Sequence, residues 1–164
     1  MILEADHAKL QEGPMRERLC CPVDVYMLLE RGGRLLLLRR AAGAAYAPLL
    51  LCPPSGHLEQ GEDVAATAVR ETAEETGIEL RRDEVRCVTV VQHQSPGGQA
   101  RIGWFFAAGP GWAGEPVNRE PAKHSELVWV VGGPGGLYMG STGSLAGRGA
   151  VGGALAGTGQ PSAL

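Results

Sequence analysis

One helical segment constrains this chain more than any other part of its 164 residues. From Asp63 to Thr76, small and apolar residues recur at helical spacing, and Gly77 follows as a left-handed stop. Apolar runs of strand length lie around it, separated by turn-rich segments. These strand candidates are residues 23–30, 34–40, 49–52, 84–93, 101–108 and 126–131. One helix among five or six strands predicts a mixed α/β domain in which the helix packs on a sheet.

The first two strand candidates predict a β-hairpin. Residues 23–30 and 34–40 meet at an Arg-Gly-Gly-Arg segment, residues 31–34, which has the composition of a tight turn. Residues 53–56 read Pro-Pro-Ser-Gly and break the apolar run that precedes them.

Composition divides the chain into one domain and two appendages. Residues 15–130 are expected to form the domain, because 44% of the chain is hydrophobic and no apolar run approaches the roughly 18 residues of a membrane span. Residues 1–14 are an N-terminal extension without the features of a secretory signal, which predicts a cytoplasmic location. Residues 131–164 hold twelve of the 25 glycines and one charged residue, Arg148. We expect a flexible tail there, because ordering glycine costs much backbone entropy.

Charge and cysteine spacing argue against several classes of function. A net charge of -3 disfavours nucleic-acid binding, which needs a basic face, so an anionic substrate requires local positive charge. The four cysteines form no Cys-x-x-Cys pair and are expected to be reduced and structural. His7, His93 and His124 are too far apart in the sequence to suggest a metal site.

Three glutamates of the predicted helix share one face. Glu71, Glu74 and Glu75 fall within one sector, because residues three and four apart are neighbours on a helix surface. One interpretation is a solvated face on which Arg70 pairs with Glu74. The other is a divalent cation held among the carboxylates, and hard oxygen ligands suit Mg²⁺ or Mn²⁺. The loop pattern of an EF-hand calcium site is absent.

A longer motif favours the cation. GHLEQGEDVAATAVRETAEETGI, residues 56–78, resembles the signature of the Nudix hydrolases, G-x5-E-x7-R-E-U-x-E-E-x-G-U, in which U is a bulky apolar residue. Thr72 is the one departure from this signature. The matching residues are Gly56, Glu62, Arg70, Glu71, Glu74, Glu75, Gly77 and Ile78. The resemblance extends from about Pro22 to Val130.

A second segment resembles the MutT-like members of that family. WAGEPVNRE, residues 112–120, is similar to their W-x-G-E-P segment, in which a later acid reaches back to the metal. Glu120 occupies that place here, although a plain loop carboxylate is the alternative interpretation.

The resemblance implies a fold and a reaction. The fold is an α/β/α sandwich with a mixed β-sheet, and the reaction is Mg²⁺-dependent hydrolysis of a nucleoside diphosphate linked to another group, with Mn²⁺ as a second cation. The implied metal ligands are Glu71, Glu74, Glu75, Glu120 and the backbone carbonyl of Ser55. Arg70 is expected to hold the glutamates in place, and Glu62 to act through water or by fixing the loop. The general base stays open among the four ligand glutamates.

Substrate identity is the least constrained prediction. Arg39 and Arg40 are candidates for local positive charge, His57 for a phosphate contact and Trp112 for stacking on a base, each with an ordinary surface or core role as the alternative. A (d)NTP or modified nucleotide is favoured as substrate, with ADP-ribose or another nucleotide sugar as alternatives. A Nudix-fold module that binds a nucleotide without turnover is the second hypothesis. An uncovered sheet edge favours a homodimer.

Overall fold

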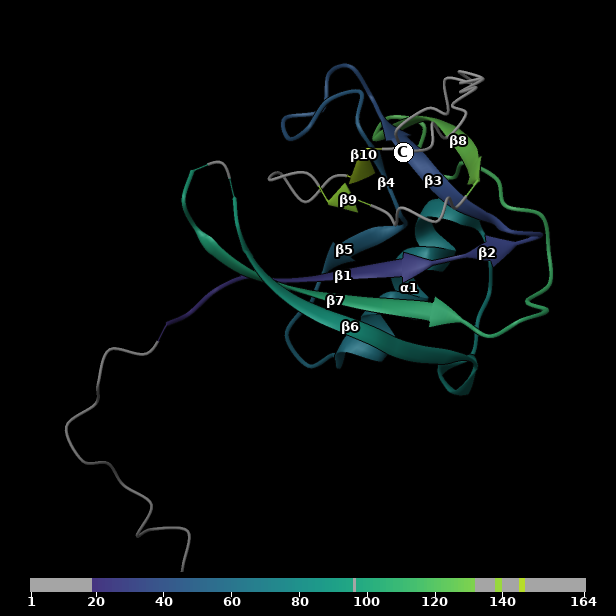
Figure 1. Cartoon of the computed structure of the whole chain (residues 1–164), viewed down its shortest axis with the longest axis horizontal. Helices are drawn as coiled ribbons and strands as arrows, with labels where there is room; N and C mark the ends of the chain where they lie inside the picture. Colours follow the sequence, from purple (N-terminus) through teal and green to yellow (C-terminus); the bar gives the residue numbers. More distant parts are fainter. Residues whose placement is uncertain (1–18, 96, 132–137, 140–144, 147–164) are drawn as a thin grey trace, which may run out of the picture.

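The computed structural model describes residues 19–95, 97–131, 138–139 and 145–146, and its strands form two sheets (Figure 1). The first sheet is mixed, because β1 runs parallel to β7 while its other neighbour, β5, and the β6–β7 pair are antiparallel. Its strands, in spatial order, are β5 (Ser55–His57), β1 (Val23–Leu28), β7 (Ala100–Ala108) and β6 (Val85–Gln94).

The second sheet is built on β3, which pairs antiparallel with β8 along its whole length. The strands of this sheet are β2 (Glu30–Arg31), β3 (Arg34–Arg40), β4 (Leu51–Cys52), β8 (His124–Val131), β9 (Tyr138–Met139) and β10 (Leu145–Ala146). The strands predicted from the apolar runs are thus present. The extension 1–14 and most of the segment 131–164 lie outside the described residues, and the flexible tail stays a prediction.

The chain passes from one sheet to the other at Leu29, which is fully buried. Glu30 and Arg31 pair with β3 across the turn, and the Leu29 carbonyl accepts a hydrogen bond from the Leu36 N–H at 2.9 Å, while β1 pairs with β5 and β7. The predicted hairpin between residues 23–30 and 34–40 is therefore wrong beyond its tip. Residues on both faces of β1 are buried, so the strand is stabilised more between two neighbours in a sheet than in an isolated hairpin.

Helix α1 (Val64–Thr76) confirms the predicted helix and its ends. The Asp63 side chain caps it by accepting hydrogen bonds from the backbone N–H groups of Ala65 and Ala66, each 3.0 Å long. Gly77 ends it with φ 72° and donates its N–H to the carbonyl of Ala73. A short 3₁₀ helix, η2 (Arg82–Glu84), follows and leads into β6.

Threonines rather than large apolar residues fill much of the buried face of α1. Thr72 and Thr76 are fully buried, and their hydroxyl groups donate to the carbonyls of Ala68 and Thr72 at 2.6 Å. A buried hydroxyl is tolerated when it is hydrogen-bonded. Thr72, the one departure from the Nudix signature, thus keeps the buried position that the signature gives to an apolar residue.

The hydrophobic core lies between α1 and the sheets. Alternate residues of β1 and the residue after it, Val25, Met27 and Leu29, point into it and meet Ile78 and Phe106. None of the helices in the described ranges has the length and hydrophobicity needed to cross a bilayer. The core thus fixes β5 and α1 on either side of one cavity, which is described next.

Candidate functional site

A cavity of about 530 Å³ opens between β5, the C-terminal half of α1 and the loop before β8. Glu71 and Glu75 of α1 line it on one side, and Lys123 and His124 line it on another. Arg40 and Arg101 add two further cationic side chains to its walls. The cavity therefore brings cationic side chains next to carboxylates in a chain whose net charge is -3.

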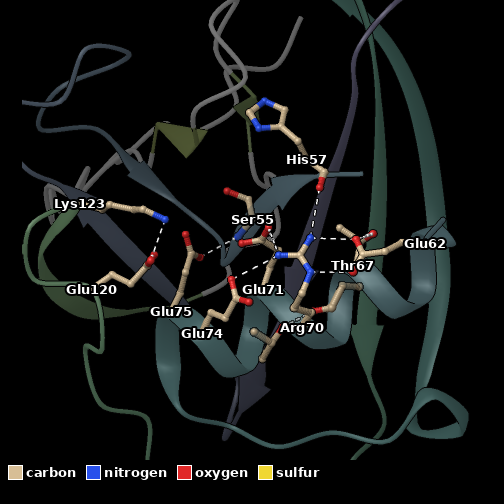
Figure 2. Close-up of polar contacts among 12 residues, drawn as sticks. Ser55, His57, Glu62, Thr67, Arg70, Glu71, Glu74, Glu75, Glu120 and Lys123 are labelled. Atoms are coloured by element: carbon tan, nitrogen blue, oxygen red, sulfur yellow. Dashed lines mark hydrogen bonds and ion pairs between the residues drawn. The ribbon is translucent and has the colours of Figure 1, made fainter. Parts of the chain in front are cut away.

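Arg70 organises the acidic side of the cavity (Figure 2). Its Nε and Nη2 donate to the two carboxylate oxygens of Glu62 at 2.7 and 2.9 Å. Its Nη1 donates to Glu71 at 2.7 Å and to Glu74 at 3.3 Å, and its Nη2 also reaches the carbonyl of His57 at 3.3 Å. These charge-assisted bonds hold the pKa of Glu62 down at about 2. One guanidinium thus connects β5, the loop after it and two helix carboxylates.

Gly56 leaves the space that Glu71 occupies. A Cβ atom on Gly56 would fall 1.9 Å from the carboxyl carbon of Glu71, so no other residue fits there without displacing this side chain. The Glu71 side chain is mostly buried, and burial raises its pKa while the hydrogen bond from Arg70 lowers it. Glycine at position 56 is therefore required for Glu71 to face the cavity.

Glu75 is the most deeply buried carboxylate of the helix, with 4% of its surface exposed. The backbone N–H of Ser55 donates to its Oε2 at 2.8 Å, which joins β5 to α1. Burial raises the pKa of Glu75 to about 8, because the Ser55 bond offsets only part of the desolvation. Glu74, by contrast, has a half-exposed side chain.

The loop before β8 brings Glu120 and His124 together. The backbone N–H groups of Lys123 and His124 both donate to the carbonyl of Glu120 at 2.9 Å. Asn118 braces this turn, since it accepts from the Glu120 N–H at 3.1 Å and donates to the His124 carbonyl at 2.7 Å. Lys123 pairs with Oε1 of Glu120 at 2.7 Å. Of the described side chains, none hydrogen-bonds the buried Oε2 of Glu120.

Glu75, Glu120 and His124 offer three donor atoms within 4.8 Å of one another. His124 is 2% exposed, its Nε2 lies 3.7 Å from Oε1 of Glu75, and burial lowers its pKa to about 4. Sequence reasoning missed this histidine because it asked only whether the histidines lie close enough in the sequence to form a metal site with one another. The signal lay in its place four residues after Glu120, at the end of the loop that carries this predicted ligand.

A second polar cluster also lines the cavity. Arg101 of β7 grips Asp24 of β1 with two hydrogen bonds of 2.7 and 2.5 Å. The predicted phosphate contact, His57, lines the cavity beside them, with its Nε2 2.9 Å from Nη2 of Arg101. His93 lies 3.4 Å from Asp24. Neither Arg101 nor Asp24 was a candidate from the sequence, because their contact depends on the parallel pairing of β1 and β7.

The remaining predicted residues separate into two groups. Ser55 and Arg40 line the cavity, and Arg40 donates to the carbonyl of Tyr46 at 2.7 Å. Arg39 and Trp112 are not among the described residues that line it. Arg39 pairs with Glu126 at 2.5 Å. Trp112 stacks on a second indole, Trp129, at 6.4 Å between ring centroids.

The fold and the acidic helix face define a protein class, and sequence comparison agrees. Residues 22–131 match the NUDIX domain family, which is well over half of the chain. The chain therefore belongs to this family. The predicted α/β Nudix-type fold with a mixed sheet is also confirmed.

Individual relatives place the chain within the family. The MutT NUDIX hydrolase from Burkholderia pseudomallei is 29% identical with a TM-score of 0.61, over 68% of this chain and 84% of that one. The E. coli ORF135 protein is 29% identical with a TM-score of 0.54, over 67% of this chain and 73% of that one. The Danio rerio m7GpppN-mRNA hydrolase NUDT17 is 41% identical over 64 residues, 38% of this chain. That match spans only 21% of the NUDT17 chain.

Proposed function

We propose that the protein is a divalent-cation-dependent pyrophosphohydrolase that cleaves a nucleoside diphosphate linked to another group, with a (d)NTP or modified nucleotide as substrate. One observation carries this proposal: the carboxylates of Glu71 and Glu75 face the same cavity as the cationic Arg40, Arg101 and Lys123. A polyphosphate repels a nucleophile, so its hydrolysis depends on positioning and on neutralising charge. This cavity combines carboxylates, which can bind a cation, with cationic side chains, which can bind phosphate.

The acidic residues fit Mg²⁺, with Mn²⁺ as the alternative. The proposed donors are Glu71, Glu74, Glu75, Glu120 and the carbonyl of Ser55. Glu75 is buried, and the described residues offer no hydrogen bond to the buried Oε2 of Glu120, a costly arrangement that a cation relieves. When bound, the cation neutralises phosphate charge and lowers the pKa of a bound water.

The other residues bind and position the substrate in this proposal. Arg40, Lys123 and His57 line the cavity and are the proposed phosphate contacts. Arg70 is a positioning residue, because it touches carboxylates and the His57 carbonyl. A carboxylate of Glu71, Glu74, Glu75 or Glu120 takes the proton of the attacking water. Arg39 and Trp112 lie outside the cavity lining and are left out of the binding set.

The direct test is product release from a panel of nucleotides, with and without Mg²⁺. The panel holds (d)NTPs, ADP-ribose, a nucleotide sugar and, because of the NUDT17 match, an m7GpppG cap. We expect cation-dependent pyrophosphate release from a (d)NTP. Glu75→Gln should lower kcat by at least about 100-fold. Glu79→Gln is the matched control, since Glu79 is exposed and does not line the cavity.

The panel also separates the alternatives. Turnover of ADP-ribose or of the cap alone would replace the proposed substrate while leaving the reaction class intact. Nucleotide binding without product would contradict the hydrolase and favour a binding module. Equal kcat values for Glu75→Gln and Glu79→Gln would show that Glu75 takes no part in the reaction.

We further propose a homodimer and a cytoplasmic location. β6 is an edge of the first sheet in the described part of the chain, and Val88, Val90 and Val91 on it are 45%, 46% and 37% exposed. An exposed apolar edge strand is a template for pairing with a second chain. The cysteines of the described ranges are free thiols, the state that the cytoplasm maintains.

A further inference from the structure

We infer that His124 is a direct ligand of the bound cation, so that Glu75, Glu120 and His124 form a mixed nitrogen and oxygen site that binds Mn²⁺ more tightly than Mg²⁺. This inference rests on the proposed function and names the cation preference of the same cavity. It adds a nitrogen donor to a set that was predicted to contain oxygen alone.

The first argument is that buried polar atoms at this site lack partners. His124 is 2% exposed, and no described residue makes a hydrogen bond to its Nδ1. Oε2 of Glu120 is likewise buried and has no hydrogen bond from a described residue. Both residues adjoin Glu75, which is 4% exposed. Buried polar groups without hydrogen bonds are uncommon and costly, and a cation bound by one ring nitrogen of His124 would also satisfy Oε2 of Glu120.

The second argument is that the spacing suits one ion. Ligands of an ion with bonds of about 2.1 Å are separated by about 3 to 4.2 Å. His124 Nε2 and Glu75 Oε1 are 3.7 Å apart, and the three donor atoms lie within 4.8 Å of one another. Separations above about 4.2 Å require the Glu120 side chain to move toward the ion. Lys123, which holds the other oxygen of Glu120 at 2.7 Å, is exposed and free to turn away toward a phosphate.

The third argument is donor chemistry. Mg²⁺ and Mn²⁺ both accept oxygen ligands, but Mg²⁺ gives up its waters reluctantly, whereas Mn²⁺, as a first-row transition cation, exchanges a water for an imidazole nitrogen more readily. Replacing a water by a buried imidazole therefore favours Mn²⁺ over Mg²⁺. The preference for Mn²⁺ over Mg²⁺ comes from His124, because Glu75 and Glu120 offer oxygen to either ion.

A second histidine of the cavity region provides a matched control. His93 also has ring nitrogens without hydrogen bonds from the described residues. The carboxylate beside it, Asp24, already accepts hydrogen bonds from Nε and Nη2 of Arg101. His93 thus faces a carboxylate with both oxygens bound by Arg101, while His124 lies beside Glu120, whose Oε2 has no hydrogen bond from a described residue.

The test is pulsed electron paramagnetic resonance of Mn²⁺ added to the full chain, which detects nitrogen bound directly to the ion. We expect a ¹⁴N coupling in the wild type that changes to ¹⁵N when the protein is labelled with ¹⁵N-histidine. This comparison needs no variant. His124→Gln should lose the coupling and weaken Mn²⁺ binding by at least about tenfold in calorimetry, with a smaller effect on Mg²⁺. His93→Gln should keep both signal and affinity.

Each other outcome overturns the inference. Bound Mn²⁺ without a histidine coupling, a coupling that persists in His124→Gln, or equal affinities for Mn²⁺ and Mg²⁺ would each remove His124 from the ligand set. None of these results contradicts the proposed hydrolase activity, which is tested separately by product release with Mg²⁺. Absence of hydrolysis with an intact histidine coupling would instead contradict the proposed function alone.

Discussion

Gly56 controls the position of a carboxylate that lies fifteen residues away in the sequence. Gly56→Ala places a methyl group 1.9 Å from the Glu71 carboxyl carbon, so the Glu71 carboxylate must move from its present position. We expect kcat/KM for the best substrate to fall by about 100-fold, because a displacement of about 1 Å in a site has that effect. Gly43→Ala is the control, since nothing lies within 4 Å of its added Cβ. Equal rates for the two variants would contradict this role.

The Arg70–Glu62 pair predicts a specific dependence of stability on pH. The folded state holds the pKa of Glu62 at about 2, below its ordinary value of 4.5, so the pair stabilises the protein above pH 4.5 and loses that effect as pH falls toward 2. Glu62→Gln should therefore lower the free energy of unfolding at pH 7, and its difference from the wild type should shrink between pH 4.5 and 2. Urea denaturation at several pH values measures this. A difference that stays constant with pH would point to packing instead.

At the scale of elements, the end of α1 depends on the backbone of one residue. Gly77 has φ 72°, and a Cβ there would lie 2.8 Å from Nε of Arg119. Gly77→Ala should lower the free energy of unfolding by about 1–2 kcal/mol, the cost of a left-handed conformation for a residue with a Cβ. Gly77→Asn should cost less, because asparagine tolerates this conformation. Thermal and urea denaturation check both variants, and equal losses would favour the contact with Arg119 as the cause.

Periodicity and the family signature were enough to predict α1, its ends and the strands with apolar side chains. β5 was missed because Ser-Gly-His has no apolar pattern, and its residues pair with β1 through the backbone. The hairpin was overextended because local pattern does not reveal that Leu29 crosses between sheets. Arg101 was missed for the same reason, because its partner Asp24 is distant in the sequence.

For the molecule as a whole, the exposed edge of β6 predicts self-association. Size-exclusion chromatography with light scattering should give twice the 17.2 kDa mass of one chain. Val90→Lys should shift the protein to the monomer, because a charge on an edge strand opposes pairing. Val117→Lys alters another exposed valine outside β6 and should leave the mass unchanged. A monomeric wild type at micromolar concentration would contradict the dimer.

The placement of β1 also has a consequence for how the protein is made. β1 sits at the centre of its sheet, yet Val25 pairs with Trp104 and Tyr26 with Ser55, so both neighbours leave the ribosome later than β1 does. Pairings between distant segments slow folding, because the intervening loop must close first. The nascent chain therefore exposes an unpaired, aggregation-prone strand until β7 has been synthesised. Binding of a chaperone would protect the chain most during this interval.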